Sequence, residues 1–323
     1  MLSWNTSLHT IECLRSLEKQ SFKNFEVVVI DNGSKMEDYL NLRDGMKNIR
    51  KIKMLLKRLE KNSGITGGMN FGYRFLKGDY IVFMNNDMIV TKDFLSEIMS
   101  PFERYDNVGA VVPMIKSWKN GGPTNEIQLC GGKLTFYGTL LNKELEKYGR
   151  KVYNKETELD CATAGCLVTT RRVLKVMGEI FPPLYSVYFE DIDLSWRIRN
   201  AGFRIIYAPK SLVYHKGSMS TNLNEIPGTR QRFVVRNKYL TFWRNLPVLD
   251  FIVVFPFVLG FDLLRALKQI LRGRFVFVGS LFRGMGDFVS SAGKVKTPRK
   301  GSLSYLSWNI ESPRTTIANW NRR

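Results

Sequence analysis

The chain has 323 residues, of which 44% are hydrophobic and 24% are charged. This composition excludes a disordered or fibrous protein, because enough apolar residues are present to form a packed interior. Lysine and arginine outnumber aspartate and glutamate by 49 to 29, which gives a formal net charge of +20. Such an excess indicates an anionic partner, which could be a nucleic acid, a membrane surface or a phosphorylated substrate.

The cysteines and the first residues indicate an intracellular protein. Four cysteines and two histidines show neither a paired framework nor the spacing of a zinc site. We therefore expect a reduced, cytoplasmic environment. The first ten residues also lack the basic start and apolar run of a secretory signal peptide.

The first half of the chain alternates helical patterns with short apolar runs. Ile11, Leu14 and Leu17 form one face of a predicted helix, whose N-cap is Thr6 or Ser7. Three runs read as strands: Phe25–Ile30, Tyr80–Met84 and Val108–Ile115. Strands separated by helices predict an α/β fold with a mainly parallel sheet. Ligands of such sheets bind beyond the carboxyl ends of the strands.

The second half of the chain changes character twice. The segment Lys116–Glu158 is richer in glycine, asparagine and lysine, and it predicts loops with short strands. Ordered elements are then predicted at Leu159–Arg172, at Asp191–Asn200 as a helix and at Phe203–Tyr207 as a strand.

The C-terminal region combines an apolar segment with a basic tail. Phe251–Phe261 is apolar but has eleven residues, well short of the roughly 20 that span a bilayer. From Asp262 to the end, 12 lysines and arginines face 3 acidic residues. This combination favours contact with a membrane surface of anionic lipids. A helix packed on the rest of the protein, followed by a solvated basic tail, remains the alternative.

Asp31 directly follows the first predicted buried strand. A carboxylate at this place can accept hydrogen bonds from a ribose or from a base N–H. The following Asn32-Gly33 equally suits an Asx-turn in which Asp31 only caps the loop. Taken alone, Asp31 favours the structural interpretation.

The segment Asn62–Gly72 contains four glycines within nine residues at the start of a predicted helix. Glycines allow backbone N–H groups to approach a phosphate closely. The segment is neither a P-loop nor a GxGxxG motif. A glycine-rich turn that merely begins a helix explains it equally well.

The tripeptide Asn85-Asn86-Asp87 follows the strand Tyr80–Met84. Its oxygens are hard ligands that suit Mg²⁺ or Mn²⁺, and such an ion would hold a diphosphate. A turn of asparagine and aspartate is also a common structural feature, so this motif alone is weak.

Three carboxylates crowd the start of a predicted helix at Glu190, Asp191 and Asp193. Capping and the helix dipole explain acidic residues at this place. Three within four positions nevertheless exceed what capping requires. Like charges so close would raise one pKa toward a value useful for a general base. His215 follows Ser211–Tyr214 and, taken alone, is more typical of a structural or surface histidine than of a ligand.

In this order and at these separations, the motifs resemble glycosyltransferase family 2, which has the GT-A fold, and most closely its rhamnosyltransferase-like branch. The matching stretches are VVVIDNGS, NSGITGGMNFG, FMNNDMIV, AGCLVTTRRVL, YFEDIDLSWRIRNAGFR and YHKGS. The resemblance covers roughly residues 3–245. It implies a Rossmann-like catalytic domain at 1–245 of the nucleotide-diphospho-sugar transferase type, and a helical, apolar and basic extension at 246–323.

The resemblance also implies roles for individual residues. Asp191 would deprotonate the acceptor hydroxyl beside Glu190, with Asp193 and Arg197 on the acceptor side. Seven residues would bind the donor: Asp31, Asn62, Gly67, Gly68, Asn70, Asn85 and Gly165. A divalent metal, Mg²⁺ or Mn²⁺, would be held by Asp87 and approached by His215.

The resemblance implies an inverting transfer from a nucleotide-sugar to a hydroxyl group of a glycan. A single displacement needs no covalent enzyme nucleophile, and the sequence contains no Ser/His/Asp or Cys/His constellation for one. The basic tail suggests a lipid-linked or cell-surface saccharide as the acceptor. It also suggests peripheral contact with the inner face of the cell membrane.

The start of the chain departs from the family pattern. Family members have a full apolar strand before the residues that match Ser3–Thr6, whereas only Met1 and Leu2 stand there in this sequence. Because this strand belongs near the middle of the sheet, we expect a truncated first strand with exposed edges. We expect that either the start of the coding sequence was assigned too late or the protein is a damaged copy of a family member.

Two other classes of protein remain as alternatives. A nucleic-acid-binding protein would interleave basic and aromatic residues on one platform or carry a known module. No such module is found, the basic excess is dispersed, and we expect no nucleic-acid partner. A sugar nucleotidyltransferase would need a glycine-rich, basic loop near its start, and residues 1–25 contain none.

Overall fold

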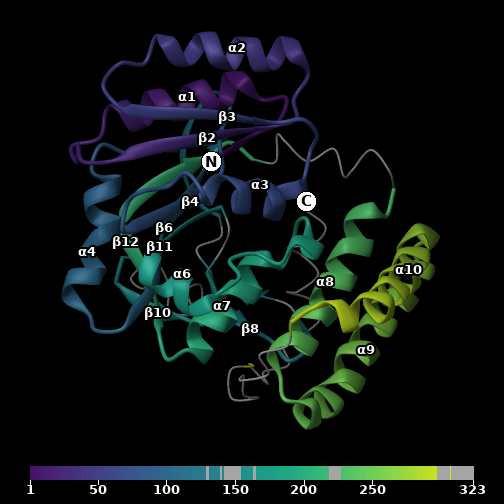
Figure 1. The fold of residues 1–323 in the computed structure, drawn as a ribbon. Coiled ribbons are helices and arrows are strands. Elements are labelled where there is room, and N and C mark those ends of the chain that lie inside the picture. Colours follow the sequence, from purple (N-terminus) through teal and green to yellow (C-terminus); the bar gives the residue numbers. More distant parts are fainter. Residues whose placement is uncertain are drawn as a thin grey trace.

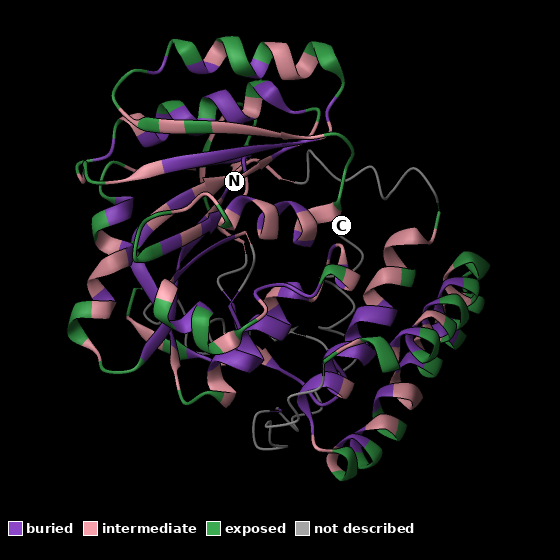
Figure 2. Cartoon of the chain, viewed as in Figure 1, coloured by how far each residue is buried: buried purple, intermediate pink, exposed green. Residues whose placement is uncertain are grey.

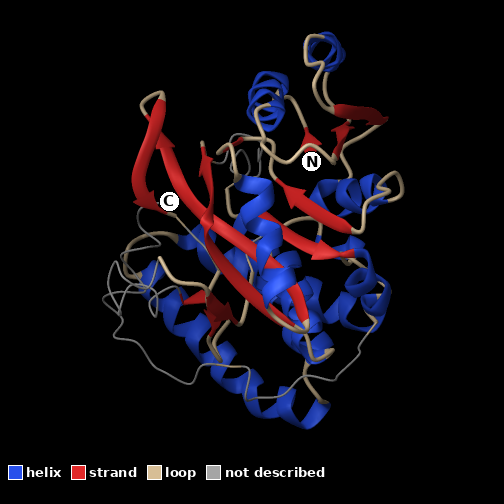
Figure 3. Ribbon diagram, turned by 90° about the vertical axis from the view of Figure 1, so that its left-hand side faces the viewer, coloured by secondary structure: helices blue, strands red, loops and turns tan. Residues whose placement is uncertain are grey.

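The computed structural model describes residues 1–128, 131–138, 140–141, 154–162, 165–217, 227–296 and 306. In these parts of the chain, an α/β region with two main sheets lies beside a group of carboxyl-terminal helices (Figure 1). Figure 3 shows the strands with helices on their flanks. Ala164 and Ser218, which belong to motifs quoted above, lie outside the described residues.

The first sheet has three parallel strands in the order β1-β2-β3. They are β1 (Leu2–Ser3), β2 (Glu26–Asn32) and β3 (Lys53–Leu59). Three helices flank them: α1 (Ser7–Glu18), α2 (Met36–Lys47) and α3 (Gly64–Tyr73). Val27 and Val29 pack in one core cluster with α1 and α2, whereas Ile30 faces Gly72 of α3. Both faces of β2 are therefore buried, as its continuous apolar run predicts.

The first strand has two residues, Leu2 and Ser3, and its truncation stays a prediction. Leu2 pairs with Ile30 and Ser3 pairs with Asp31, and among the described residues β1 pairs with β2 alone. The ammonium group of Met1 donates a hydrogen bond to the carbonyl of Val28 at 2.9 Å. Burial lowers the pKa of this ammonium to about 6, because the charged form is poorly solvated there.

The second sheet is mixed, with the strand order β10-β12-β6-β11-β4. β5 also pairs with β12, and β7 pairs with β6. Its strands are β4 (Tyr80–Met84), β5 (Met88–Val90), β6 (Val108–Lys119), β7 (Gly122–Ile127), β10 (Thr157–Leu159), β11 (Cys166–Thr170) and β12 (Arg204–His215). β6 and β12 run parallel, and the other pairs of this sheet are antiparallel. A separate small pair consists of β8 (Lys133–Leu134) and β9 (Leu140–Leu141).

Four shorter elements connect these strands. They are α4 (Phe94–Arg104), α6 (Arg171–Met177), the 3-10 turn η1 (Pro183–Tyr185) and α7 (Glu190–Asn200). The predicted strand Phe203–Tyr207 is longer than expected, because β12 continues to His215. A register shift between Ala208 and Leu212 accommodates Pro209 within the strand.

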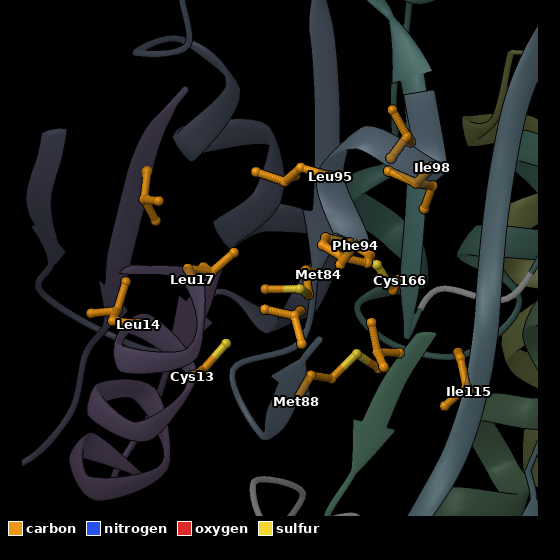
Figure 4. Close-up of a cluster of buried hydrophobic side chains, with 14 of the residues drawn as sticks. Cys13, Leu14, Leu17, Met84, Met88, Phe94, Leu95, Ile98, Ile115 and Cys166 are labelled. Atoms are coloured by element: carbon orange, nitrogen blue, oxygen red, sulfur yellow. The ribbon is translucent and has the colours of Figure 1, made fainter. Parts of the chain in front are cut away.

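A core cluster joins α1 to the second sheet (Figure 4). Cys13, Leu14 and Leu17 of α1 lie near Met84, Met88 and Cys166. Burial raises the pKa of the Cys13 thiol to about 12 and raises that of Cys166 as well, so both behave as small apolar groups. The three described cysteines form no disulfide.

Three helices follow the second sheet: α8 (Thr229–Asn245), α9 (Val248–Ile270) and α10 (Phe275–Ser291). A short 3-10 turn, η3 (Ala292–Lys294), ends this group. The apolar segment Phe251–Phe261 lies within α9, and its buried side shares a core with α7, α8 and α10. No helix in the described parts of the chain is long and apolar enough to cross a membrane.

Candidate active site

Three of the predicted site residues lie at the carboxyl ends of strands. Asp31 lies near the end of β2, Asp87 follows β4, and His215 ends β12. The side-chain amide of Asn86 donates to the hydroxyls of Thr6 and Thr10, and the Thr10 hydroxyl donates to Ser3, the ladder partner of Asp31. A continuous chain of contacts therefore connects the ends of the two sheets.

Asp87 and His215 lie next to each other at this edge of the second sheet. The Nε2 atom of His215 lies 3.2 Å from Oδ2 of Asp87. The other ring nitrogen, Nδ1, lies 2.7 Å from the side-chain oxygen of Gln128, an acceptor that suits a proton on Nδ1. Oδ1 of Asp87 is buried and has no hydrogen-bond partner among the described residues.

This pair fits a divalent metal. A carboxylate oxygen and a neutral imidazole nitrogen are suitable ligands for Mn²⁺, and a buried oxygen without a partner normally requires explanation by an ion or water. The described residues contain no cluster of three or more His, Cys, Asp or Glu that could enclose an ion. Asp87 and His215 would thus supply only part of a coordination shell, and a diphosphate and water would have to complete it.

The three residues of the Asn85-Asn86-Asp87 motif make different contacts. The backbone N–H of Asn85 donates to the carbonyl of Gly165 at 2.9 Å, which places these two predicted donor residues side by side. Asn86 is buried against α1 through Thr6 and Thr10. Asp87 alone of the three faces His215.

Asp31 is fully buried, and neither of its carboxylate oxygens accepts a hydrogen bond from the described part of the chain. Nε of Arg58 lies 3.5 Å from Oδ2. Burial raises the pKa of Asp31, whereas the hydroxyl and N–H groups of Ser34 and the positive charge of Arg58 oppose this rise. Because Ser34 follows three residues later, the turn-cap interpretation still applies, and the contact with a ribose or base stays a prediction.

The glycine-rich segment is tied down by the protein itself. The backbone N–H groups of Ser63 and Gly64 donate to the side chains of Asn32 and Asn62, respectively. Those of Ile65 and Thr66 both donate to the carbonyl of Ser186. The backbone amides of residues 63–66, at the start of α3, are therefore already hydrogen-bonded within the protein.

The glycines of α3 serve close packing. A Cβ atom on Gly68 would lie 2.8 Å from the Leu2 side chain, and one on Gly67 would lie 2.8 Å from Ser63. Asn70 binds the backbone of Phe181 in both directions. The predicted donor contacts of Gly67, Gly68 and Asn70 stay predictions, and each of these residues has a structural task.

Glu190 and Asp191 begin α7 and differ in environment. Glu190 is 4% exposed, and its Oε2 has no hydrogen-bond partner among the described residues. Burial raises the pKa of Glu190 to about 8, and the neighbouring Asp191 charge adds to the rise. Asp191 is half-buried, and its Oδ1 accepts a hydrogen bond from the N–H of Ile192. The sequence anticipated a raised pKa from like charges, whereas burial is the larger cause and Glu190 is the residue affected.

Asp193 and Arg197 belong to a buried ionic network. Nε of Arg197 lies 2.8 Å from Asp193, and the same guanidinium donates to the carbonyls of Glu179 and Ile180. The side-chain amide of Asn245 donates to Asp193 at 2.9 Å. Their acceptor-side role stays a prediction, and the contacts give both residues a task in holding α7 to its neighbours.

The segment that leads into Glu190 has an unusual backbone. Ser186, Tyr188 and Phe189 all have positive φ, between 61° and 69°, although none is glycine. Such conformations cost of order 1–3 kcal/mol each and persist only where surrounding contacts enforce them. They also concentrate at functional sites, which agrees with the position of this segment beside the carboxylate pair.

The residues that hold the segment before Glu190 lie on α8 and were not predicted from the sequence. The Asn237 amide of α8 donates to the carbonyls of Tyr185, Val187 and Tyr188 at 2.7–2.9 Å. Arg236 donates to the carbonyls of Leu184 and Tyr185. The available signal was the run of polar residues at 236–238 within a helix, which the structure shows to be buried.

The chain belongs to glycosyltransferase family 2. The family model "Glycosyl transferase family 2" matches residues 3–176, slightly more than half of the chain. The described architecture is that of GT-A glycosyltransferases. Residues 190–215 lie beyond the matched part, so the roles of the carboxylate pair and His215 depend on the geometry described above.

Among curated proteins, the chain is 27% identical over 232 residues to the uncharacterized protein y4gI of Sinorhizobium fredii. That match covers 69% of this chain and 24% of the relative. It is 32% identical over 111 residues to the amylovoran biosynthesis glycosyltransferase AmsB of Erwinia amylovora, covering 33% of this chain and 36% of AmsB. The chain thus spans only about a quarter to a third of the length of these relatives.

Two solved structures share the fold. A structure of Staphylococcus aureus TarS 1-349 in complex with UDP-GlcNAc has a TM-score of 0.58 and 19% identity, covering 90% of this chain and 79% of that one. A mannosyltransferase from Pyrobaculum calidifontis, in complex with GDP-Man and Mn²⁺, has a TM-score of 0.54 and 15% identity. That match covers 99% of this chain and 78% of the mannosyltransferase.

Proposed function

We propose that the protein transfers a sugar from a nucleotide-diphosphate donor to a hydroxyl group of a glycan, with inversion at the anomeric carbon. The observation that carries the proposal is the Asp87–His215 pair, with its unpartnered buried oxygen, on the same edge of the sheets as Asp31. Family membership and the nucleotide-sugar ligands of the two structural relatives support this choice of donor.

Donor binding divides between the two sheets. Asp31, at the end of β2, would accept hydrogen bonds from the ribose or base. Asp87 and His215 would hold a divalent metal, which when bound neutralises the negative charge of the diphosphate. Asn85 and Gly165 lie next to this pair along the chain and across the β4–β11 ladder. A Cβ atom on Gly165 would lie 2.9 Å from the Met88 side chain, so this glycine permits close packing beside the pair.

Acceptor activation falls to the carboxylate pair. Because burial places a proton on Glu190 near neutral pH, the more exposed Asp191 is the member of the pair that would accept a proton from the acceptor hydroxyl. The N–H of Ile192 orients the Asp191 carboxylate. The rigid segment before α7 fixes where this carboxylate stands.

The acceptor class is a surface or lipid-linked saccharide at the inner face of the cell membrane. Two relatives carry names from this chemistry: the amylovoran biosynthesis glycosyltransferase AmsB and the O-antigen biosynthesis protein RfbC of Myxococcus xanthus. The strongly basic charge of the chain supports an anionic membrane as the setting.

A donor panel tests the proposal. UDP-, GDP- and dTDP-sugars are titrated by calorimetry with and without Mn²⁺, for the wild type and for Asp87→Ala. We expect one nucleotide class to bind in a metal-dependent manner and Asp87→Ala to abolish that dependence. Asp93→Ala, an exposed acidic position at the start of α4, is the control. Equal metal-dependent affinities in wild type and Asp87→Ala would remove Asp87 from the site.

A further inference from the structure

The helices α9 and α10 carry most of the large apolar side chains that the described chain leaves exposed. These side chains are Val248, Leu249, Ile252, Val253, Phe257, Leu263, Leu264, Leu267, Ile270, Leu271, Phe275, Val276, Phe282 and Val289. Leu249, Leu264 and Phe282 are 76%, 67% and 64% exposed, respectively. Contiguous exposed apolar surface on this scale marks an interaction site rather than ordinary protein surface.

The exposed residues of α9 form a stripe along the whole helix. Leu249, Val253, Phe257, Leu264 and Leu267 are four, four, seven and three residues apart, respectively, which places them on one face. The opposite face is buried through Phe251, Val254 and Val258, which pack in the core shared with α8 and α10. Because 23 residues of helix extend about 34 Å, the stripe is long enough to contact an extended surface.

Contacts with α8 hold α9 and α10 in place, so their apolar face stays exposed. Asp262 of α9 accepts hydrogen bonds from Lys238 and Tyr239 of α8, and all three groups are buried. Asp287 of α10 is paired with Arg232 of α8. Figure 2 shows exposed positions along both α9 and α10 at the edge of the molecule.

The charges around the apolar stripe are almost all positive. Residues 246–296 contain seven lysines and arginines but only three acidic residues, and two of these, Asp262 and Asp287, are paired with α8. Exposed basic groups stand at Arg272, Arg274, Arg283, Lys294 and Lys296. An apolar face bordered by positive charge is complementary to a lipid surface with anionic headgroups.

We propose that the exposed apolar face of α9 and α10 inserts into the interface of an anionic membrane while the basic residues around it bind the lipid headgroups. The inference does not depend on the sugar-transfer chemistry. It extends the expectation that the apolar segment Phe251–Phe261 and the basic tail contact the membrane together, because α10 also contributes exposed apolar side chains. Removal of residues 262–323 would delete the last nine residues of α9 and all of α10, which are part of the core, so point substitutions are the proper test.

Vesicle flotation with the full chain tests the apolar contribution. Leu264→Gln combined with Phe282→Gln removes one exposed apolar group from each helix. Since burial of such a side chain is worth about tenfold in partition, we expect binding to phosphatidylglycerol-containing vesicles to fall by at least about tenfold for the pair. Leu8→Gln combined with Val176→Gln is the matched control, because those side chains are 73% and 59% exposed elsewhere. The control should bind like the wild type.

The charge contribution is tested with the same assay. Arg272→Gln and Arg274→Gln should each weaken binding about fivefold at low salt, and the loss should shrink at high salt. Arg15→Gln and Lys19→Gln, exposed on α1, serve as controls. Vesicles of phosphatidylcholine alone should bind more weakly.

Three results would overturn the proposal. The first is equal binding by the apolar variant and its control, which would reduce any contact to charge alone. The second is equal binding to neutral and anionic vesicles. The third is a wild-type oligomer in lipid-free solution, measured by light scattering, that Leu264→Gln with Phe282→Gln converts to monomers, because the face would then be an interface between copies.

Discussion

Asn237 offers the sharpest test of how the carboxylate pair is positioned. This residue is fully buried on α8 and donates to three carbonyls of the segment that precedes Glu190. Asn237→Ala would remove both N–H donors and leave those carbonyls without them. Each hydrogen bond contributes about 1 kcal/mol net, and each buried group left unsatisfied costs about 1–3 kcal/mol. We expect a loss of roughly 3–4 kcal/mol in the free energy of unfolding.

The loss should also reach catalysis. Without Asn237, the positive φ values of Ser186, Tyr188 and Phe189 lose part of their support, so the segment should relax and carry Asp191 out of place. Misplacement of a reacting group lowers kcat more than it raises KM for a donor that binds elsewhere. Urea unfolding and steady-state kinetics below the denaturing range measure the two effects separately.

Asn245→Ala is the matched control. Asn245 is also fully buried on α8 and donates two hydrogen bonds, to Asp193 and to the carbonyl of Thr241, without touching the strained segment. It should lose stability with less effect on kcat. Ser186→Gly in the Asn237→Ala background should regain about 1 kcal/mol, because glycine tolerates positive φ. If Asn237→Ala and Asn245→Ala lower kcat equally, the argument that Asn237 positions the base is refuted.

The remaining predictions concern the carboxylates and the first strand. Asp191→Asn preserves the size of the side chain and the start of the helix but removes the proton acceptor, so turnover should fall about 10²–10⁴-fold with donor affinity unchanged. If Glu190→Gln is inactive and Asp191→Asn is active, Glu190 is the proton acceptor. Because the pKa of Glu190 rises from 4.5 to about 8 on folding, its contribution to stability should be full below pH 4.5 and lost as pH rises to 8. The free energy of unfolding of Glu190→Gln should lack this decline. An apolar segment of about five residues added before Met1 should raise the melting temperature, since a peptide N–H replaces a buried ammonium whose pKa is lowered to about 6; an unchanged melting temperature would contradict it.

Local patterns were sufficient to predict several of the strands and to select the edge of the sheets where the candidate site is sought. Phe25–Ile30 and Tyr80–Met84 are short apolar runs that end in polar residues, and both became strands with Asp31 and Asp87 at their ends. The predicted helix starts also hold, with Thr6 as the N-cap residue of α1. The hydroxyl of Thr6 nevertheless accepts a hydrogen bond from the Asn86 side-chain amide and does not cap the helix.

Local patterns could not predict contacts between residues that are far apart in the sequence. Three carboxylates at the start of a helix look equivalent in sequence, yet Glu190 is buried without a partner and Asp193 is buried in an ionic network. Their difference depends on α8, about 50 residues later in the chain. The glycines of α3 illustrate the same limit, because the carbonyl that occupies their helix start belongs to Ser186.

The helix α8 connects the candidate active site to the proposed membrane surface. Its residues Arg236 and Asn237 hold the segment before Glu190, while Lys238 binds Asp262 of α9. Since the three residues are consecutive and buried on one helix, the carboxylate pair and α9 are fixed to the same rigid element. A membrane that binds α9 and α10 would therefore hold Asp191 at a constant height above the lipid headgroups, the arrangement that an acceptor anchored in those lipids requires.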